Sequence, residues 1–292
     1  MPRYAVLLLL AACTCCAAAA SEPYTIHPIG STEAPYGYLE HLPDGYATTA
    51  KAKYPLVFFL HGLGELGDSN KDLPRVAGAG PLKLIANHDK LSAIFAQQQA
   101  IVIAPQGLRE DKWWKNEKML ATLAFIIRTH PIDLDRVYIT GLSMGGGGTW
   151  GMATSIPDQL AAIIPICGAA GPGDVTKLHG LPIWANHALN DGTVKFPDTT
   201  KKWFDRILAD LKLGPDGGVM TGYMHTDKPW TGWLGKQGWQ WQEGTMPANI
   251  PAKQLQLVLT VYPDGSHDSW SRTYDNPALW AWLFAQTRAK RH

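Results

Sequence analysis

The chain has 292 residues, of which 46% are hydrophobic and 17% are charged, so it can bury a sizeable core and is not intrinsically disordered. Its 26 Lys and Arg residues against 25 Asp and Glu residues give a formal net charge of +1, with no polybasic block. This balance argues against nucleic acid or an anionic membrane as a partner. The length fits one large α/β domain, expected over residues 21–292.

Residues 1–20 have the features of an export signal. Arg3 supplies a positive start, an apolar stretch follows, and small residues precede Ser21. The stretch is too short and too rich in Ala and Cys for a transmembrane span, which needs about 20 strongly apolar residues. The run Leu10-Ala-Ala-Cys13 also resembles a bacterial lipobox, which would place a lipid on Cys13. We expect a secreted or periplasmic protein, with a membrane-anchored lipoprotein as the alternative.

Short β-rich runs alternate with longer helical patterns along the rest of the chain. Several of the short runs are continuously apolar, which is typical of strands buried on both faces. The alternation predicts an α/β fold with a mainly parallel central sheet and helices on both faces. The predicted strands are 36–41, 56–60, 101–104, 137–140, 162–166, 182–187 and 255–261. The predicted helices are 82–98, 117–129, 146–155, 198–213 and 277–288, with Asp198 as the N-cap of the fourth.

A glycine-rich loop, His61-Gly-Leu-Gly-Glu65, follows the strand predicted at 56–60. At the carboxyl end of a strand, such a loop can direct a backbone N–H toward a substrate oxyanion. We interpret His61 itself as a residue that packs in the loop, because a catalytic base is expected later in the chain.

The strongest motif is Gly141-Leu-Ser143-Met-Gly145, between a predicted strand and a predicted helix. A sharp strand-to-helix turn exposes a serine oxygen, and the flanking glycines let neighbouring backbone approach closely. The helix that begins behind the serine favours developing negative charge. We therefore predict Ser143 as a nucleophile, with the N–H of Met144 as an oxyanion donor.

Cys167 is the one cysteine outside the export signal, which excludes an intramolecular disulfide in the mature chain. It lies in an apolar strand-like run, where we expect a buried, inert thiol. No Cys/His cluster has metal-ligand spacing, and we expect neither a metal nor another cofactor.

The acid and the base should follow strands that come after the nucleophile. Asp191 lies in the turn after the strand 182–187, and His267 lies in the loop after the strand 255–261. An aspartate there can accept from the imidazole and fix its tautomer. The order Ser143, Asp191, His267 is that of α/β-hydrolases. The weaker candidates are Asp174, Asp198 and Asp268 for the acid and His179, His187 and His225 for the base.

The segment 217–251 breaks the alternation of strands and helices. It has little periodicity, much Gly and Pro, and four tryptophans: Trp230, Trp233, Trp239 and Trp241. Long segments of this kind are usually functional or disordered, and disordered ones rarely carry so many aromatics. We expect an ordered insertion that leaves the sheet and lines the substrate cleft with at least one tryptophan. The alternative is a small satellite core that fixes the loop.

Five stretches together resemble the α/β-hydrolases of the phospholipase/carboxylesterase and dienelactone-hydrolase-like group, especially exported peptidase-like or polyhydroxybutyrate-depolymerase-like esterases. In that family the serine, aspartate and histidine form a catalytic triad, and backbone after the His-Gly pair completes the oxyanion hole. The resemblance implies these roles for Ser143, Asp191 and His267, and for the N–H groups of Leu63 and Met144. Compact family members lack so long an insertion before the histidine. The matching stretches are His61-Gly-Leu-Gly-Glu65, Gly141-Leu-Ser-Met-Gly-Gly146 with Gly148-Thr-Trp150, Ile166-Cys-Gly168, His187-Ala-Leu-Asn-Asp191 and Gly265-Ser-His-Asp-Ser-Trp270.

Three functions are compatible with these motifs. The leading hypothesis is a secreted serine esterase that forms an acyl-enzyme and acts on a carboxylic ester, including one linked to a polymer. A peptidase that cleaves short peptides is the first alternative, although no amine-recognising acidic pocket is evident. The second is a catalytically inactive hydrolase fold that binds carbohydrate through its tryptophans.

Overall fold

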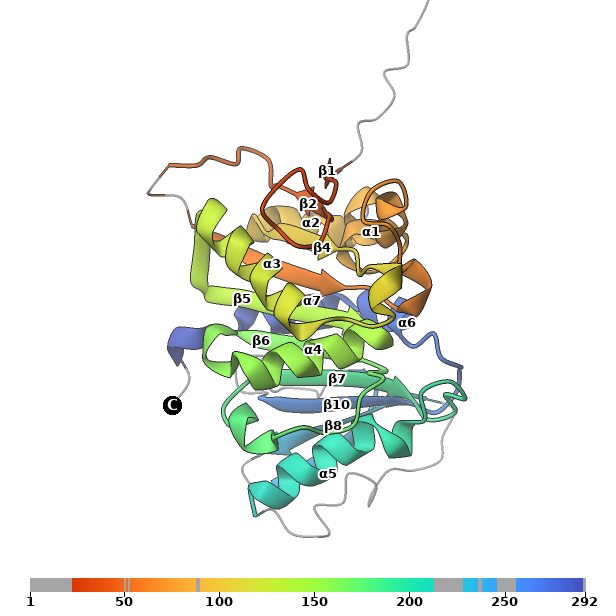
Figure 1. The fold of residues 1–292 in the computed structure, drawn as a ribbon. Coiled ribbons are helices and arrows are strands. Elements are labelled where there is room, and N and C mark those ends of the chain that lie inside the picture. The colour runs from red at the N-terminus through yellow and green to blue at the C-terminus, as the bar shows by residue number, and fades with distance from the viewer. Residues whose placement is uncertain are drawn as a thin grey trace, which may run out of the picture.

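A mixed sheet with helices on both faces organises the molecule (Figure 1). The computed structural model describes residues 23–49, 51, 53–87, 90–212, 228–235, 238–245 and 256–290. The expected export signal and Cys13 lie outside these residues, as does much of the segment 217–251. No helix of the described residues is long and apolar enough to cross a bilayer.

Ten strands of the described chain form one sheet in the order β1-β2-β4-β3-β5-β6-β7-β10-β8-β9. The six central strands, from β4 to β10, are parallel, and antiparallel pairs complete both edges. Every residue of β3, β4 and β6 is buried, as expected for strands covered on both faces. The strands are β1 (Thr25–His27), β2 (Tyr38–His41), β3 (Tyr54–Leu60), β4 (Ile101–Pro105), β5 (Ile132–Leu142), β6 (Ala162–Ile166), β7 (Ile183–Ala188), β8 (Trp230–Gly235), β9 (Gly238–Glu243) and β10 (Leu257–Tyr262). The predicted α/β fold class is confirmed.

Helices cover the two faces of the sheet in separate groups. Those on one face contribute Leu123, Trp150 and Phe204 to one core cluster, and those on the other contribute Phe95 and Trp280 to a second. The first group is α3 (Asn116–Thr129), α4 (Met144–Ser155) and α5 (Thr200–Asp210). The second group is α1 (Gly80–Ala86), α2 (Lys90–Gln98), α6 (Trp270–Tyr274) and α7 (Pro277–Ala285).

Two helix predictions were wrong in their bounds. The single helix expected over 82–98 is two helices, because Asn87 ends α1 with its N–H bonded to Lys83 O and Ile85 O. Asparagine favours helix ends over helix interiors. Asp198 is not the N-cap of α5: it lies in the short 3₁₀ turn Phe196–Asp198, and Thr199 holds the N-cap position.

The described parts of the segment 217–251 do not leave the sheet. They form the antiparallel pair β8–β9, and β8 pairs with β10, so the sheet continues through the tryptophan-rich stretch. The alternation Trp239-Gln-Trp-Gln242 has the period of a strand and was the signal that could have revealed it. The prediction of an excursion from the sheet is therefore wrong for these residues.

Candidate active site

Parallel strands bring the predicted site residues to one edge of the sheet. Ser143 follows β5, Asp191 follows β7, and His267 follows β10, each beyond the carboxyl end of its strand. The carboxyl ends of neighbouring parallel strands meet at the same edge, which is where ligands bind in open α/β sheets.

Ser143 occupies a strained turn between β5 and α4. Its φ of 53° and ψ of −119° are rarely adopted by a residue with a side chain. The Ser143 N–H donates to Ile166 O at 2.9 Å, and the Ser143 carbonyl accepts from the N–H groups of Gly147 and Ala169, both at 3.0 Å. These three bonds fix the turn between α4 and the end of β6, so the strain is held by the surrounding backbone.

Glycine is required on both sides of this turn. A Cβ on Gly145 would lie 2.0 Å from Leu60 O, and one on Gly141 would lie 2.4 Å from Gly145 O. No side chain can occupy such space unless the backbone shifts. The two glycines of the motif thus allow the start of α4 to pack directly against the ends of β3 and β5.

The imidazole of His267 joins the serine and the aspartate. Its Nε2 lies 2.8 Å from Ser143 Oγ, and its Nδ1 lies 2.7 Å from Asp191 Oδ2. An ionised carboxylate only accepts, so Nδ1–H donates to Asp191 and Nε2 is left to accept the serine proton. The Trp270 indole packs perpendicular to the His267 ring, with ring centroids 5.3 Å apart. The three predicted residues are therefore brought into one hydrogen-bonded chain.

The Asp191 carboxylate is buried and accepts four hydrogen bonds. Oδ1 accepts from the N–H groups of Thr193 and Val194, both at 2.8 Å, and Oδ2 accepts from His187 and His267. Burial alone would raise the pKa of Asp191, but the four hydrogen bonds outweigh it and hold that pKa well below its usual value. The residue that orients His267 is thus a stable anion.

Two helices begin at the same edge of the sheet. Met144 is the first residue of α4, and Leu63 is the first residue of the 3₁₀ helix Leu63–Glu65. The N–H groups of a first helical turn lack intrahelical acceptors, so both can donate to an oxyanion. Leu63 is 56% exposed, so it lies at the surface of the molecule.

His61 fixes the loop that carries Leu63. Its Nδ1 donates to Gly62 O at 2.6 Å, and its Nε2 accepts from Gly107 N–H at 2.9 Å, which ties the ends of β3 and β4 together. Burial lowers the pKa of His61 to about 4, so the ring is neutral. The side chain packs inside the loop, at the position that the sequence analysis gave it.

The other predicted candidates have different partners. The exposed Asp174 caps a 3₁₀ helix through Thr176 N–H, and Asp268 accepts from Ser271 N–H at the start of α6. His179 pairs with Asp210, and His225 lies outside the described residues. His187 differs from these, because it bonds to Asp191 directly, a contact that the sequence analysis missed.

Cys167 lies much closer to the site than its position in the sequence suggested. Its Sγ lies within 4.8 Å of ligand atoms of Asp191 and His267, the one group of described residues spaced to hold a metal ion. Burial raises the pKa of the thiol to about 12, so the sulfur is protonated at neutral pH. Because the Asp191 oxygens already accept four hydrogen bonds, this group as arranged does not fit a metal.

The four tryptophans of β8 and β9 lie mainly in core contacts. Trp233 is 7% exposed and lies opposite Val258, near the amino end of β10 and away from His267. Trp239 packs edge-on against Phe204 of α5, with Trp241 beside it. Trp230 pairs with Val261, at the end of β10 that leads to the site. A role in substrate binding stays a prediction, and it is best placed at Trp230.

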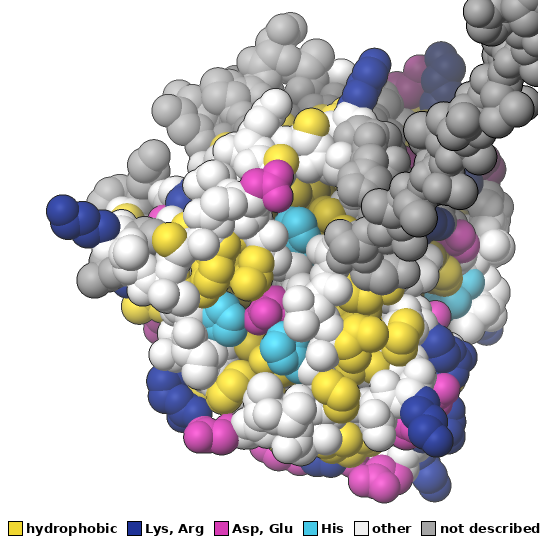
Figure 2. Space-filling model, turned by 90° about the horizontal axis from the view of Figure 1, so that it is seen from above, with side chains coloured by type: hydrophobic (Ala, Val, Ile, Leu, Met, Phe, Trp, Pro, Cys, Tyr) yellow, Lys and Arg dark blue, Asp and Glu magenta, His cyan; other side chains and the backbone are white. Residues whose placement is uncertain are grey.

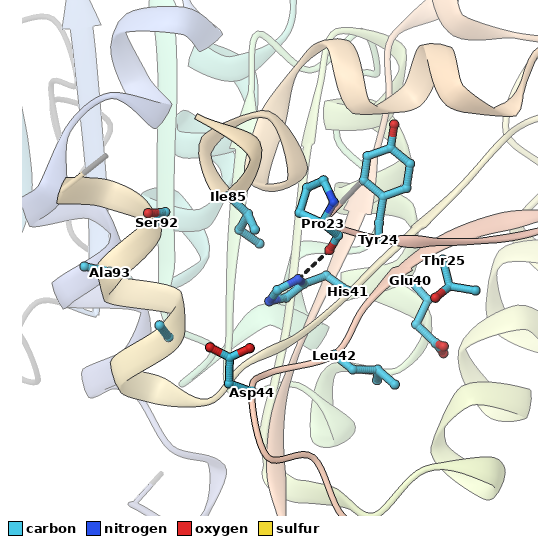
Figure 3. Close-up of a pocket in the computed structure, with 11 residues that line it drawn as sticks. Pro23, Tyr24, Thr25, Glu40, His41, Leu42, Asp44, Ile85, Ser92 and Ala93 are labelled. Atoms are coloured by element: carbon cyan, nitrogen blue, oxygen red, sulfur yellow. Dashed lines mark hydrogen bonds between the residues drawn. The ribbon is translucent and has the colours of Figure 1, made fainter. Parts of the chain in front are cut away.

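A cavity of about 400 Å³ lies apart from these residues, between β1, β2 and α2 (Figure 3). Figure 3 shows His41 and Asp44 beside it, and His41 Nδ1 bonds to Pro23 O at 2.7 Å. None of Ser143, Asp191 or His267 lines this cavity. The cavity is therefore separate from the edge of the sheet that carries the serine.

Known proteins share this fold. No family model matches the chain. Feruloyl esterase D of Neurospora crassa is 26% identical over 163 residues, which are 54% of this chain and 53% of that protein. A solved thermostable esterase matches with a TM-score of 0.59 and 26% identity, over 90% of this chain and 62% of that one. Acetyl xylan esterase from Aspergillus awamori matches with a TM-score of 0.56 and 14% identity, over 89% and 99% of the two chains.

These likenesses and the strand order show an α/β-hydrolase fold. The chain spans about half the length of the curated relative and less than two thirds of the thermostable esterase.

Proposed function

We propose that this chain is an exported serine hydrolase that cleaves carboxylic esters. The observation that carries the proposal is the hydrogen-bonded chain Ser143–His267–Asp191, with the serine at a strained strand-to-helix turn. Backbone strain at a serine that is hydrogen-bonded to an imidazole is characteristic of a positioned nucleophile.

The reaction would proceed through an acyl-enzyme. His267 Nε2 takes the Ser143 proton as Oγ attacks the ester carbonyl, and the N–H groups of Leu63 and Met144 stabilise the oxyanion. The intermediate collapses as His267 donates its proton to the leaving alcohol. Water, deprotonated by His267, then attacks the acyl-enzyme, and His267 returns that proton to Ser143 Oγ as the acid leaves. Asp191 stays ionised and stabilises the imidazolium that forms in each step.

An ester linked to a polymer is the substrate class that we favour. The relative that matches half of this chain is by name a feruloyl esterase, and one of the similar folds is an acetyl xylan esterase. An aromatic or acetyl ester suits a half-buried serine whose partner His267 packs against Trp270, because aromatic side chains bind flat and apolar groups.

A panel of feruloyl, acetyl, butyryl and peptide substrates, assayed with wild type and Ser143→Ala, tests the proposal. We expect wild type to turn over at least one ester, and S143A to lose that turnover while it keeps the wild-type circular dichroism spectrum. Ser155→Ala, at the opposite end of α4, is the matched control and should stay active. Ester turnover by S143A at the wild-type rate would contradict the assignment of Ser143 as the nucleophile. Turnover of peptides alone by the wild-type protein would contradict the proposed esterase activity.

Export has a separate test. N-terminal sequencing of the mature protein should give Ser21 as the first residue. A lipid-modified Cys13 would show the lipoprotein route instead. A cytoplasmic protein that keeps residues 1–20 would contradict export.

A further inference from the structure

A second histidine lies against the carboxylate that orients His267. His187 is on β7, and its side chain and that of Asp191 are both 0% exposed. Its Nε2 lies 3.2 Å from Asp191 Oδ2 and 2.7 Å from Val194 O. Oδ2 is the same oxygen that accepts from His267. The mechanism above makes no use of this buried ring.

The partners of His187 require a proton on its Nε2. The carbonyl of Val194 and the ionised Asp191 carboxylate only accept, so Nε2 carries the proton and donates to both. Nδ1 lies 2.8 Å from the Thr200 hydroxyl, at the start of α5, and is hydrogen-bonded to it. Phe196 packs edge-on against the ring, with centroids 5.5 Å apart. The ring is therefore held on three sides, with one N–H directed at the Asp191 loop.

We propose that His187, oriented by Thr200, is a positioning residue that holds Asp191 in the geometry His267 requires. The proposal rests on the esterase function proposed above. The His187 N–H binds the loop 191–194 at both ends, at the Asp191 carboxylate and at the Val194 carbonyl. Oδ1 is fixed independently by two backbone N–H groups, so His187 is the donor that fixes Oδ2 from the protein side.

The effect should appear in kcat and not in KM. His187 is fully buried behind Asp191 and contacts neither Ser143 nor the surface, so substrate binding does not depend on it. Loss of its N–H leaves Oδ2 with His267 as its one donor, and the carboxylate can tilt away from the imidazole. The expected cost is about tenfold in kcat, the scale of one hydrogen bond to a charged group.

The test compares His187→Leu with His187→Gln on the ester that the wild-type enzyme turns over best. Leucine removes the N–H donor, whereas glutamine offers an N–H at a similar reach. With rates normalised to the active-site concentration, we expect about a tenfold lower kcat for H187L at an unchanged KM, and recovery of most of it in H187Q. His179→Leu, at a surface histidine paired with Asp210, controls for the substitution and should be unchanged.

A second pair of variants avoids a large change in the core. Thr200→Val keeps the shape but removes the hydroxyl that bonds to Nδ1, and Thr200→Ser keeps the hydroxyl. We expect T200V to lower kcat by about threefold, the scale of one neutral hydrogen bond, and T200S to restore it.

Wild-type kcat in H187L, or equal losses in H187L and H187Q, would overturn the proposal, as would equal effects of T200V and T200S. Failure of the esterase function itself gives a different result, since the wild-type enzyme would then turn over no ester at all.

Discussion

At the scale of single residues, the site depends on which atoms carry protons. Asp191 accepts from two backbone N–H groups on one oxygen and from two imidazoles on the other. All four partners donate, so they stabilise the ionised form of the Asp191 carboxylate. The position therefore tolerates no amide in place of the carboxylate.

Asp191→Asn should lower kcat by on the order of 10⁴, the size of the corresponding effect in the best-studied triad. The asparagine oxygen would stay with the backbone N–H groups of Thr193 and Val194, which directs its NH₂ group toward His267. His267 would then carry its proton on Nε2, where it cannot accept from Ser143. Single-turnover kinetics measures the loss, and Asp174→Asn, at an exposed cap, should leave kcat unchanged. Near-wild-type kcat in D191N would assign the acid role to another residue.

The sequence was sufficient to predict that Ser143, Asp191 and His267 lie at one edge of the sheet, because each lies in the connection that follows a recognisable strand. It was insufficient for His187 and Cys167. His187 contacts Asp191 because the turn after β7 brings residues four positions apart together. Cys167 lies near His267 because the sheet places the ends of their two strands at the same edge. Local patterns specify which residues end a strand, whereas contacts of this kind depend on loop shape and strand order.

At the scale of elements, the turn into α4 is the most constrained connection. Gly145→Ala should abolish ester turnover and destabilise the fold, because its Cβ would lie 2.0 Å from Leu60 O and would push α4 off β3. Gly151→Ala in the same helix is the matched control, since its Cβ would meet only Asn116 Oδ1, at 3.8 Å. G151A should be active and stabilised by about 0.5–1 kcal/mol, the usual gain from Gly to Ala in a helix. Thermal unfolding and ester assays compare the two. An active G145A of wild-type stability would contradict the close packing.

Two tryptophans of the hairpin β8–β9 should have different roles, one in packing and one in substrate binding. Trp233→Ala should lower stability by about 3 kcal/mol with substrate preference unchanged, because this buried side chain lies toward the amino end of β10. Trp230→Ala should raise KM for a bulky ester and leave a small acetyl ester almost unaffected, because Trp230 lies at the opposite end of the strand pair. Kinetics on both esters, together with urea unfolding, distinguish these effects. If W230A keeps the wild-type substrate preference, Trp230 does not contact the substrate and the hairpin has only a structural role.

The sequence analysis placed most central strands correctly because β3, β4 and β6 are continuous apolar runs. The strands toward the two edges of the sheet were harder to predict, since β1 has only three residues and β8, beside the edge strand β9, contains Gly232. Such strands form largely because they pair with a neighbouring strand, and a short segment does not show in its own composition which strand it will pair with.

At the scale of the whole molecule, the buried carboxylate of Glu40 and two partly buried histidines tie the β1–β2 edge to the rest of the fold. Glu40 on β2 bonds to His27 of β1 at 3.1 Å and to His130, beyond the end of α3, at 2.8 Å. Figure 2 shows histidines beside acidic side chains on this face. Burial raises the pKa of Glu40, but the hydrogen bonds from His130 and His27 outweigh it and lower that pKa to about 2.

This cluster predicts how stability depends on pH. A carboxyl whose pKa is lowered by folding stabilises the fold above its unfolded pKa, and that stability is lost as pH falls toward 2. Glu40→Gln should therefore cost on the order of 3 kcal/mol at pH 7 and progressively less below about pH 4.5. Urea unfolding of wild type and E40Q between pH 7 and pH 2.5 measures this, with the exposed Glu110→Gln as control. A difference between wild type and E40Q that is independent of pH would contradict the assignment.

The central claim is that Ser143 is an activated nucleophile on an α/β-hydrolase fold. Reaction of the native, wild-type protein with a fluorophosphonate, followed by mass spectrometry of the intact chain and of its peptides, tests it most directly. We predict one phosphonyl group per chain, located on Ser143, and no labelling after the protein is denatured. An unlabelled native protein, or a label on a residue other than Ser143, would contradict the claim.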